Sequence, residues 1–312
     1  MSMAELLKTY KTKDIDKKIV GKVERNMMKN KSGKDKRCVY DPPRSNKIYH
    51  PSSIANTECL RQLQLKKLNV EKTNDTYNAH SQRIFDTGHD FGYRFQEYLY
   101  YLGILLGRWH CVECKYEWMD VENPSPSTCP SCGVDLTIWY NLHYMEVPVH
   151  NDEYNLGGQA DAMIKQSWGR QMIELKTIKC RGEYNSEYSV SFEDLQAPKP
   201  AHVKQLNIYM DNAKRQYDGI QDLDRGLIIY QGKNNQKLKQ FPVKLQKGLV
   251  NNLYDKIKMV RHSIEQGFLY PRAGKNKSCR MCKWCDYKTL CWDELGNGGK
   301  EKGKEDFKKL VK

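Results

Sequence analysis

Two acidic residues and a lysine in the middle of the chain have the types and spacing for metal-dependent phosphate chemistry. Asp161 ends a Gly-x-x-Asp run, and Glu174 and Lys176 follow it by 13 and 15 positions. In a strand, residues i and i+2 point to the same face, so Glu174 and Lys176 project together. An antiparallel pairing with the preceding strand would bring Asp161 to the same place. Two adjacent carboxylates repel each other unless a cation lies between them, and Mg²⁺ or Mn²⁺ satisfies both. Such an ion would activate a water for attack on a phosphate, with Lys176 polarising that water.

Each of these short motifs also occurs elsewhere in the chain. A second Glu-x-Lys lies at 113–115 and a second Gly-x-x-Asp at 219–222. Only the first pair places an aspartate in one strand pattern and a glutamate in the next, at a separation typical of a hairpin. The alternative interpretation is two strands with ordinary surface charges. Downstream, Gln205 and Tyr209 are four positions apart, on one face of an expected helix, where they can orient a phosphate or a metal-bound water.

In this order and spacing, the three motifs resemble the RecB-like branch of the PD-(D/E)XK nucleases. That family's pattern is Gly-x-x-Asp, then Glu-x-Lys, then Gln-x-x-x-Tyr. The resemblance implies a restriction-endonuclease-like α/β fold and hydrolysis of phosphodiester bonds. It also implies a role for each matching residue: Asp161, Glu174 and the backbone carbonyl of Leu175 as metal ligands, Lys176 as the catalytic lysine, and Gln205 and Tyr209 in support.

The chain departs from the family upstream of these motifs. The family usually carries a metal-binding histidine on an early helix, in a Gly-x-x-x-His motif. Counting from Gly88 puts Gly92 at the histidine position, and counting from Gly92 puts Gln96 there. The only nearby histidine is His89. The sequence leaves open whether Gln96, His89 or no residue replaces the missing ligand.

Four cysteines form a zinc-ribbon signature between the expected helices and strands. Two Cys-x2-Cys pairs are separated by 14 residues, and each pair predicts a tight turn that directs two thiolates toward one tetrahedral ion. Such a site is closed and structural. The predicted zinc ligands are Cys111, Cys114, Cys129 and Cys132.

A second group of cysteines near the C-terminus has the spacing of iron–sulfur proteins: Cys279, Cys282, Cys285 and Cys291. A wholly local site of these four, or a second zinc site, is chemically possible. RecB-like nucleases with a 4Fe–4S cluster, such as the AddB subunit and the CRISPR-associated exonucleases, instead take one cysteine from an N-terminal helix. The segment from Pro51 to Arg61 resembles that element. The resemblance therefore implies a cluster held by Cys59, Cys282, Cys285 and Cys291, with Cys279 left over.

The elements that must position these residues follow one another as helices, three strands, a helix, two strands and a helix. This order predicts a mixed sheet flanked by helices. The expected helices cover 54–68, 80–106, 201–217 and 247–267, and the expected strands cover 136–149, 156–165, 171–178, 226–230 and 238–243. The resulting organisation is a basic arm (1–48), N-terminal helices (49–107), a zinc-ribbon insertion (108–135), the nuclease core (136–270), the iron–sulfur segment (271–297) and a basic, disordered tail (298–312).

The charge of the chain points to a polyanionic partner. Its 52 Lys and Arg residues exceed its 38 Asp and Glu residues by 14. No apolar run approaches the roughly 18 residues of a membrane-spanning helix, and the first residues lack a signal-peptide core, so a cytoplasmic protein is expected. Together with the motifs, this predicts a DNA nuclease that acts on single strands or duplex ends in recombination, repair or replication. An exonuclease from a phage, with a helicase or recombination partner, fits this prediction. A non-catalytic DNA-binding scaffold and an RNA-processing nuclease are the alternatives.

Overall fold

The computed structural model describes residues 47–73, 79–181, 190–297 and 300–311. These residues fall into two units, which are treated separately. The larger unit is Ser45–Asp75 with Gly88–Lys312. The smaller is Met1–Arg44 with Thr76–Thr87, of which only the beginning of helix α5 (Ala79–Tyr101) is described. The expected basic arm lies almost wholly outside the described residues. Across the described ranges, no helix combines the length and the hydropathy that a membrane span requires.

The core of the larger unit is a mixed sheet in the order β2-β1-β6-β7-β8-β9, with β3 also paired to β1. Strands β7 and β8 are parallel, and the other pairs in the sheet are antiparallel. A separate hairpin contains β4 and β5. The strands are β1 (Leu105–Cys111), β2 (Glu117–Asp120), β3 (Leu142–Tyr144), β4 (Val147–Asn151), β5 (Leu156–Ala160), β6 (Ala162–Gln166), β7 (Gly169–Ile178), β8 (Arg225–Gly232) and β9 (Leu238–Lys244).

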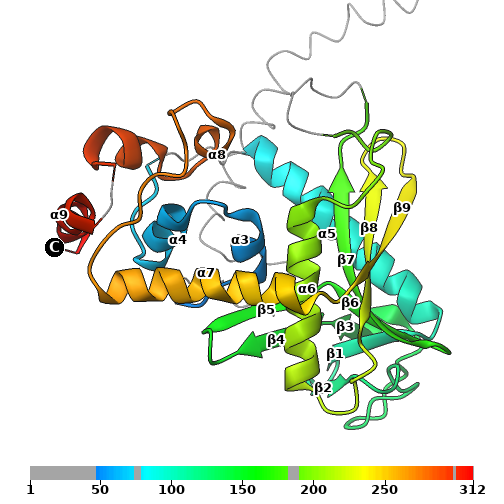
Figure 1. The fold of residues 1–312 in the computed structure, drawn as a ribbon. Coiled ribbons are helices and arrows are strands. Elements are labelled where there is room, and N and C mark those ends of the chain that lie inside the picture. The colour runs from blue at the N-terminus through cyan, green and yellow to red at the C-terminus, as the bar shows by residue number, and fades with distance from the viewer. Residues whose placement is uncertain (1–46, 74–78, 182–189, 298–299, 312) are drawn as a thin grey trace, which may run out of the picture. The chain divides into compact units, whose positions relative to one another are not determined.

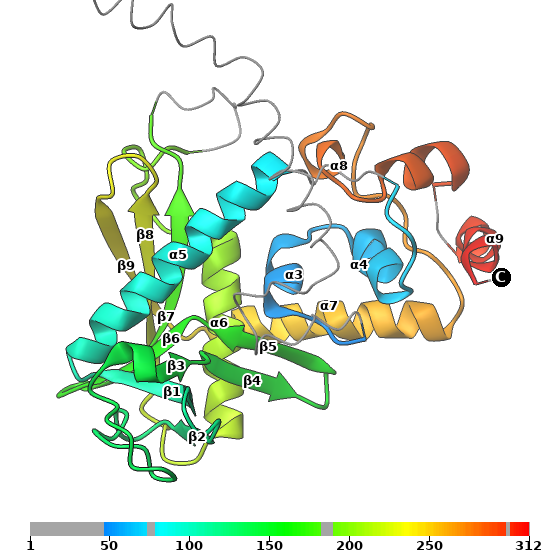
Figure 2. The same ribbon diagram turned by 180° about the vertical axis from the view of Figure 1, so that it is seen from behind.

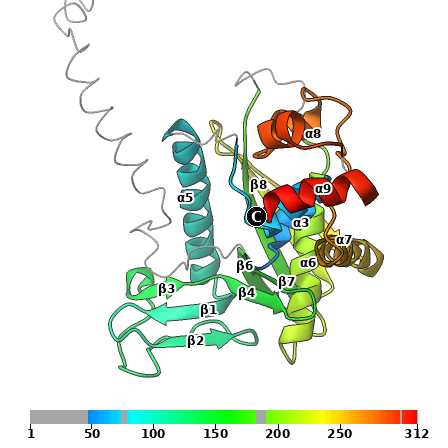
Figure 3. The same ribbon diagram turned by 90° about the vertical axis from the view of Figure 1, so that its left-hand side faces the viewer.

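Helices cover both faces of this sheet, as the order of elements predicts. Helix α6 (Pro200–Gln216) lies in front of β7 and β8 in Figure 1, and residues 88–101 of α5 lie behind them, as Figure 2 shows from the other side. Alternation along β7 explains the two layers. Met172 packs toward α6 in one buried cluster, whereas its neighbour Ile173 packs with Phe91 of α5 in another. Figure 3 shows α5 and α6 on opposite sides of β7.

The remaining helices are α3 (Pro51–Asn56), α4 (Leu60–Lys67), α7 (Lys247–Glu265), the short α8 (Arg280–Lys283) and α9 (Lys300–Leu310), with single turns η2 (Trp139–Asn141) and η3 (Leu290–Glu294). Of these, α3 and α7 pack against α6, and α4 packs against α7. Ile54, Ile208 and Ile257 join α3, α6 and α7 in one apolar cluster. Leu65, Tyr287 and Phe307 join α4, the cysteine segment and α9 in another.

Several predicted elements need correction. The helix expected over 54–68 is two helices, because the chain is extended at Thr57 and Cys59. The second helix ends at Tyr101, and Gly103, with a φ of 67°, turns the chain into β1. Strand β1 is absent from the expected elements, because Leu105 and Leu106 continue the apolar pattern of the expected helix and residues 108–111 fall in the expected zinc ribbon. The stretch 136–149 contains η2, β3 and the start of β4 instead of one strand.

The C-terminal tail also differs from the expectation of disorder. Helix α9 covers most of it, and its backbone is tied to the larger unit by the N–H of Leu269, which donates to the Gly303 carbonyl at 3.1 Å. Gly303 is needed at this contact, since a Cβ there would lie 3.2 Å from the nitrogen of Leu269 and closer still to its oxygen. A helix this polar is stabilised by its contacts with the rest of the fold, so local composition did not reveal it.

Candidate active site and metal centres

Strand pairing brings Asp161 and Glu174 together. Strands β6 and β7 are antiparallel with Ala162 opposite Ile173, so the next position along places Asp161 opposite Glu174. The backbone N–H of Leu175 donates to Oδ2 of Asp161 at 2.6 Å. Because the N–H and C=O groups of one strand residue point to the same edge, the Leu175 carbonyl faces the same gap. The three predicted metal ligands therefore share one location.

Glu174 is a buried carboxylate whose ion-pair partner among the described residues is Lys176. Its exposed fraction is 0%, and no described residue donates a well-aligned hydrogen bond to either oxygen. Nζ of Lys176 forms an ion pair with Oε1. Burial raises the pKa of Glu174 to about 8; Lys176 opposes this rise and the charge of Asp161 adds to it. A divalent cation would satisfy these oxygens, so the residues present fit the ion that the motif implies.

Lys176 projects beside Glu174 on the face of β7 that meets α6, and its side chain is 27% exposed. Burial alone would lower its pKa, but the charges of Glu174 and Asp161 raise it above the usual value. Glu146 adds to this effect from the junction of β3 and β4. Its φ of 60° is rare for a side chain other than glycine. Glu146 is an acidic residue near the site that the sequence analysis missed.

Helix α6 supplies the predicted amide and phenol. Nε2 of Gln205 donates to Oη of Tyr209 at 3.3 Å, and both side chains are buried. Burial raises the pKa of Tyr209 well above its usual value, and the nearby charges of Glu174 and Asp161 act in the same direction. Close packing explains why the Gly-x-x-Asp run begins with a glycine. A Cβ on Gly158 would lie 2.9 Å from Cδ of Pro51 and 3.3 Å from Cε1 of Tyr209.

Of the two side chains near the position of the missing histidine, Gln96 contacts the segment that carries Asp161 and His89 does not. Gln96 is buried on α5, and its Nε2 donates to the backbone carbonyl of Asp161 at 2.8 Å. His89 is exposed on the same helix. Gln96 is therefore the residue that contacts the carboxylate-bearing segment, and the contact is to backbone.

His202 is a second residue near the site that the sequence analysis missed. It lies three positions before Gln205 on α6, and its Nδ1 is 2.7 Å from Oη of Tyr230 on β8. Tyr230 is the parallel neighbour of Lys176. Helical spacing from Gln205 could have indicated this residue, but only the pairing of β7 with β8 places it beside the lysine.

Comparison with known proteins agrees with this geometry. A family model described as the PD-(D/E)XK nuclease superfamily matches residues 60–292. The chain belongs to this superfamily.

Solved structures similar to this PD-(D/E)XK chain include SSO0001, with a TM-score of 0.40 and 13% identity over 84% of this chain and 93% of that one. Another is an alkaline exonuclease, LHK-Exo, from Laribacter hongkongensis. Its TM-score is 0.35 and its identity 10%, over 70% of this chain and 88% of that one. The same exonuclease in complex with dAMP gives the same values. No curated protein matches the sequence.

The first group of cysteines in this nuclease-superfamily chain converges as predicted. The four sulfur atoms all lie within 4.8 Å of one another: Cys111, Cys114, Cys129 and Cys132. The two Cys-x2-Cys turns share a backbone conformation and a hydrogen bond. In each, the fifth residue, Lys115 or Gly133, has a positive φ and donates to the carbonyl of the first cysteine at 3.0 Å. This spacing suits a single tetrahedral ion.

The charges of these thiols also favour a cation. A backbone hydrogen bond from Tyr116, together with the neighbouring thiols, lowers the pKa of Cys114 to about 6. The neighbouring thiols raise the pKa of Cys132 despite a backbone hydrogen bond from Val134. Four thiolates cannot share this space without a cation to balance them. A bound metal ion would supply that charge.

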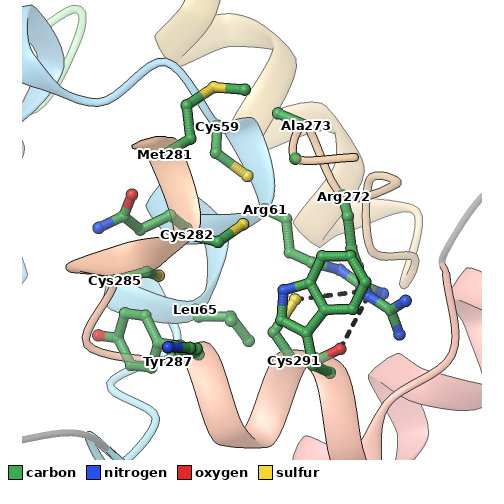
Figure 4. Close-up of a pocket in the computed structure, with 14 residues that line it drawn as sticks. Cys59, Arg61, Leu65, Arg272, Ala273, Met281, Cys282, Cys285, Tyr287 and Cys291 are labelled. Atoms are coloured by element: carbon green, nitrogen blue, oxygen red, sulfur yellow. Dashed lines mark hydrogen bonds between the residues drawn. The ribbon is translucent and has the colours of Figure 1, made fainter. Parts of the chain in front are cut away.

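The second group lines a pocket between α4 and the C-terminal segment. Figure 4 shows Cys59, Cys282, Cys285 and Cys291 around it, together with Arg61. Burial raises the pKa of Cys285 to about 11, and the charges of Cys59, Cys291 and Cys282 add to this effect. Cys59 is the residue before α4, and it is more than 200 positions from the other three cysteines in the sequence. The family resemblance implied this set of four, and the four line one pocket; among the described residues, only the first group of cysteines has sulfur atoms close enough to share one metal ion.

Cys279 lies at the edge of this pocket. A Cβ on Gly274 would overlap Sγ of Cys282 and lie 2.7 Å from Sγ of Cys279, so a glycine leaves room for both sulfur atoms. Cys279 itself is the capping residue before α8 and is not among the residues that line the pocket.

Two arginines hold Cys291 in place. Nη1 of Arg61 donates to its Sγ at 3.5 Å, and Nε of Arg272 donates to its carbonyl at 2.9 Å, as Figure 4 shows. Arg61 is fully buried, and its Nη2 is 3.1 Å from Oδ2 of Asp306 on α9. Helix α9 thereby reaches a cysteine of the pocket through one buried ion pair.

Proposed function

We propose that the protein is a metal-dependent deoxyribonuclease, an exonuclease that acts on DNA ends in recombination, repair or replication. One observation carries the proposal. The carboxylates of Asp161 and Glu174 converge beside Lys176 in a chain of the PD-(D/E)XK nuclease superfamily. The excess of 14 basic residues supports a phosphodiester substrate.

The proposed cation is Mg²⁺ or Mn²⁺, held by Asp161, Glu174 and the Leu175 carbonyl. When bound, it would stabilise the negative charge that develops on the phosphate. Lys176 would orient the attacking water through its ammonium group. The water oxygen forms the new bond to phosphorus and releases a proton to solvent, the P–O bond to the leaving deoxyribose breaks, and the leaving oxygen gains a proton from solvent. Gln205 and Tyr209 would position the phosphate from α6.

We also propose Zn²⁺ at the four-cysteine group and a 4Fe–4S cluster in the pocket of Cys59, Cys282, Cys285 and Cys291. Both would be structural. The cluster would join segments of chain that are far apart in sequence. Metal and sulfide analysis of anaerobically purified protein tests both, with one zinc and about four irons per chain expected. Two zincs without iron would remove the cluster and leave the nuclease proposal intact.

Cleavage assays test the nuclease proposal itself. With Mg²⁺ or Mn²⁺, the wild type should degrade end-labelled linear DNA, leave covalently closed circular DNA intact and act weakly on RNA. Asp161→Asn, Glu174→Gln and Lys176→Met should each lower the rate by about 100-fold or more. Asp222→Asn is the matched control, because Asp222 ends the second Gly-x-x-Asp run and pairs with Arg170.

The outcomes of these assays separate the alternatives. Full activity of Asp161→Asn would reject the site. Cleavage of circular DNA would indicate an endonuclease, and faster cleavage of RNA would indicate an RNA-processing enzyme. Metal-independent DNA binding by a wild type that cleaves nothing would indicate a scaffold.

A further inference from the structure

His202 extends the row of polar side chains on α6 toward the beginning of the helix. His202, Gln205 and Tyr209 are at positions i, i+3 and i+7, which share one face. Burial of Gln205 and Tyr209, and the link from His202 to Tyr230, show that this face meets β7 and β8. Seven residues of helix span roughly 10 Å. The row therefore extends well beyond the space that one phosphate occupies.

The hydrogen bonds of Tyr230 fix the tautomer of His202. Tyr230 is fully buried, and its hydroxyl oxygen accepts a hydrogen bond from the backbone N–H of Lys199 at 3.0 Å. Its hydrogen needs an acceptor, and Nδ1 of His202 lies 2.7 Å away. The hydroxyl therefore donates to Nδ1, which leaves the ring hydrogen on Nε2. Among the described residues, Nε2 has no hydrogen-bond partner.

The surroundings keep this imidazole neutral. Burial lowers the pKa of His202 to about 3, and the charges of Lys176 and Lys199 act in the same direction. The groups that face the ring are Lys176 from β7, Tyr230 from β8 and Lys199 from the residue before α6. A neutral N–H donor beside two ammonium groups suits an anion with several acceptor oxygens.

We propose that Nε2–H of His202, with Lys176 and Lys199 beside it, binds a non-bridging oxygen of a DNA phosphate next to the one that is cleaved. This inference rests on the proposed function, and it adds a substrate contact outside the family's three motifs. The hydroxyl of Tyr230 acts through His202, so Tyr230 is a positioning residue.

Binding to modified DNA tests this contact without any cleavage. Wild type, His202→Phe and His202→Gln are titrated, with Ca²⁺ as the metal, against a linear oligonucleotide and against copies that carry one methylphosphonate. The methylphosphonate is placed in turn at each of the three phosphates nearest the end. His202→Phe should weaken binding of natural DNA by about tenfold. His202→Gln, whose Nε2 can donate from a similar position, should restore part of the loss.

The modified oligonucleotides give the decisive comparison. At one position, the methylphosphonate should weaken wild-type binding by a similar factor, and His202→Phe should cause no further loss there. Tyr230→Phe should weaken binding of natural DNA by part of this factor, and it should cause no further loss on the oligonucleotide modified at that position. The inference is overturned if His202→Phe weakens binding by the same factor on every oligonucleotide, or has no effect on natural DNA.

Parallel cleavage assays distinguish this inference from the proposed function. If the position-specific effect is present but the wild type cleaves nothing with Mg²⁺ or Mn²⁺, the nuclease proposal fails and the phosphate contact stands. If the wild type cleaves DNA and the position-specific effect is absent, the nuclease proposal stands and the phosphate contact fails. Absence of any DNA binding would overturn both. Unfolding temperatures of the variants show whether each one retains its fold.

Discussion

The backbone N–H of Leu175 donates to Oδ2 of Asp161 at 2.6 Å. Asp161 lies between the end of β5 and the start of β6, so the direction of its side chain is not set by regular strand geometry. The hydrogen bond from Leu175 ties it to the strand that carries Glu174 and Lys176. Asp222, at the end of the second Gly-x-x-Asp run, bonds instead to Arg170 at 2.7 Å. The two Gly-x-x-Asp runs therefore end in aspartates with different hydrogen-bond partners, the Leu175 backbone for Asp161 and the Arg170 side chain for Asp222.

Glu174→Gln should abolish cleavage while it relieves a pH-dependent instability. The pKa of Glu174 in the folded protein, about 8, lies above its usual value of 4.5. A carboxyl with a raised pKa lowers stability as pH rises from 4.5 to 8, because the unfolded state ionises in this range while the buried carboxyl of the folded state keeps its proton. Without added Mg²⁺ or Mn²⁺, the wild type should lose on the order of 2–4 kcal/mol between pH 5 and 9 relative to Glu174→Gln. Denaturant unfolding of both at the two pH values measures this difference. The same change in the free energy of unfolding between pH 5 and 9 for both proteins would contradict this prediction.

Gln96→Leu should weaken metal binding through the backbone of Asp161. The change leaves the Asp161 carbonyl without its donor and frees the segment that carries the carboxylate. Loss of such a supporting hydrogen bond typically costs about 10- to 100-fold in metal affinity. Cleavage rate as a function of Mn²⁺ concentration measures it. His89→Ala is the control, since His89 is exposed on the same helix and should behave as wild type. The opposite pattern would assign the role to His89.

Cys129→Ser should remove the bound zinc and destabilise the sheet next to it. Cys129 is 3% exposed, and Cys111 of the same four-cysteine group ends β1, which pairs with β2, β3 and β6. Loss of the ion therefore reaches the central sheet as well as the ribbon. Zinc content and thermal unfolding measure the effect. Cys180→Ser is the control for zinc content, because Cys180 is also buried, at 6% exposed, and lies outside both cysteine groups. Unchanged zinc content in Cys129→Ser would contradict the site.

Asp306→Ala should make the proposed cluster labile. It leaves the guanidinium of Arg61 buried without its carboxylate, which typically costs about 3–5 kcal/mol. Arg61 also donates to Sγ of Cys291, so the cysteine should lose its fixed position. Iron content and the rate at which the visible absorbance bleaches in air measure the effect. Asp293→Asn is the matched control: its ion pair with Lys277 is exposed, and such pairs contribute roughly 0–1 kcal/mol. Equal bleaching of both variants would show that α9 does not support the pocket.

The sequence by itself determined the residues of the proposed catalytic centre and their order along the chain. Alternation within one strand fixes that Glu174 and Lys176 point the same way, and this needs no knowledge of the rest of the fold. The turns at the Cys-x2-Cys pairs are equally local, so the convergence of four cysteines followed from spacing alone. The parts that pattern predicted correctly are those that depend on a few neighbouring residues.

The tertiary structure decided the rest. The contact of Gln96 with Asp161, the place of His202 beside Lys176 and the approach of Cys59 to the C-terminal cysteines each join segments that are distant in sequence. Helix α9 is the clearest case. It is too polar and too short to be stable alone, and the buried pair of Asp306 with Arg61, 245 positions away, helps to hold it. Such contacts depend on the packing of the whole domain, and no local pattern of side chains encodes them.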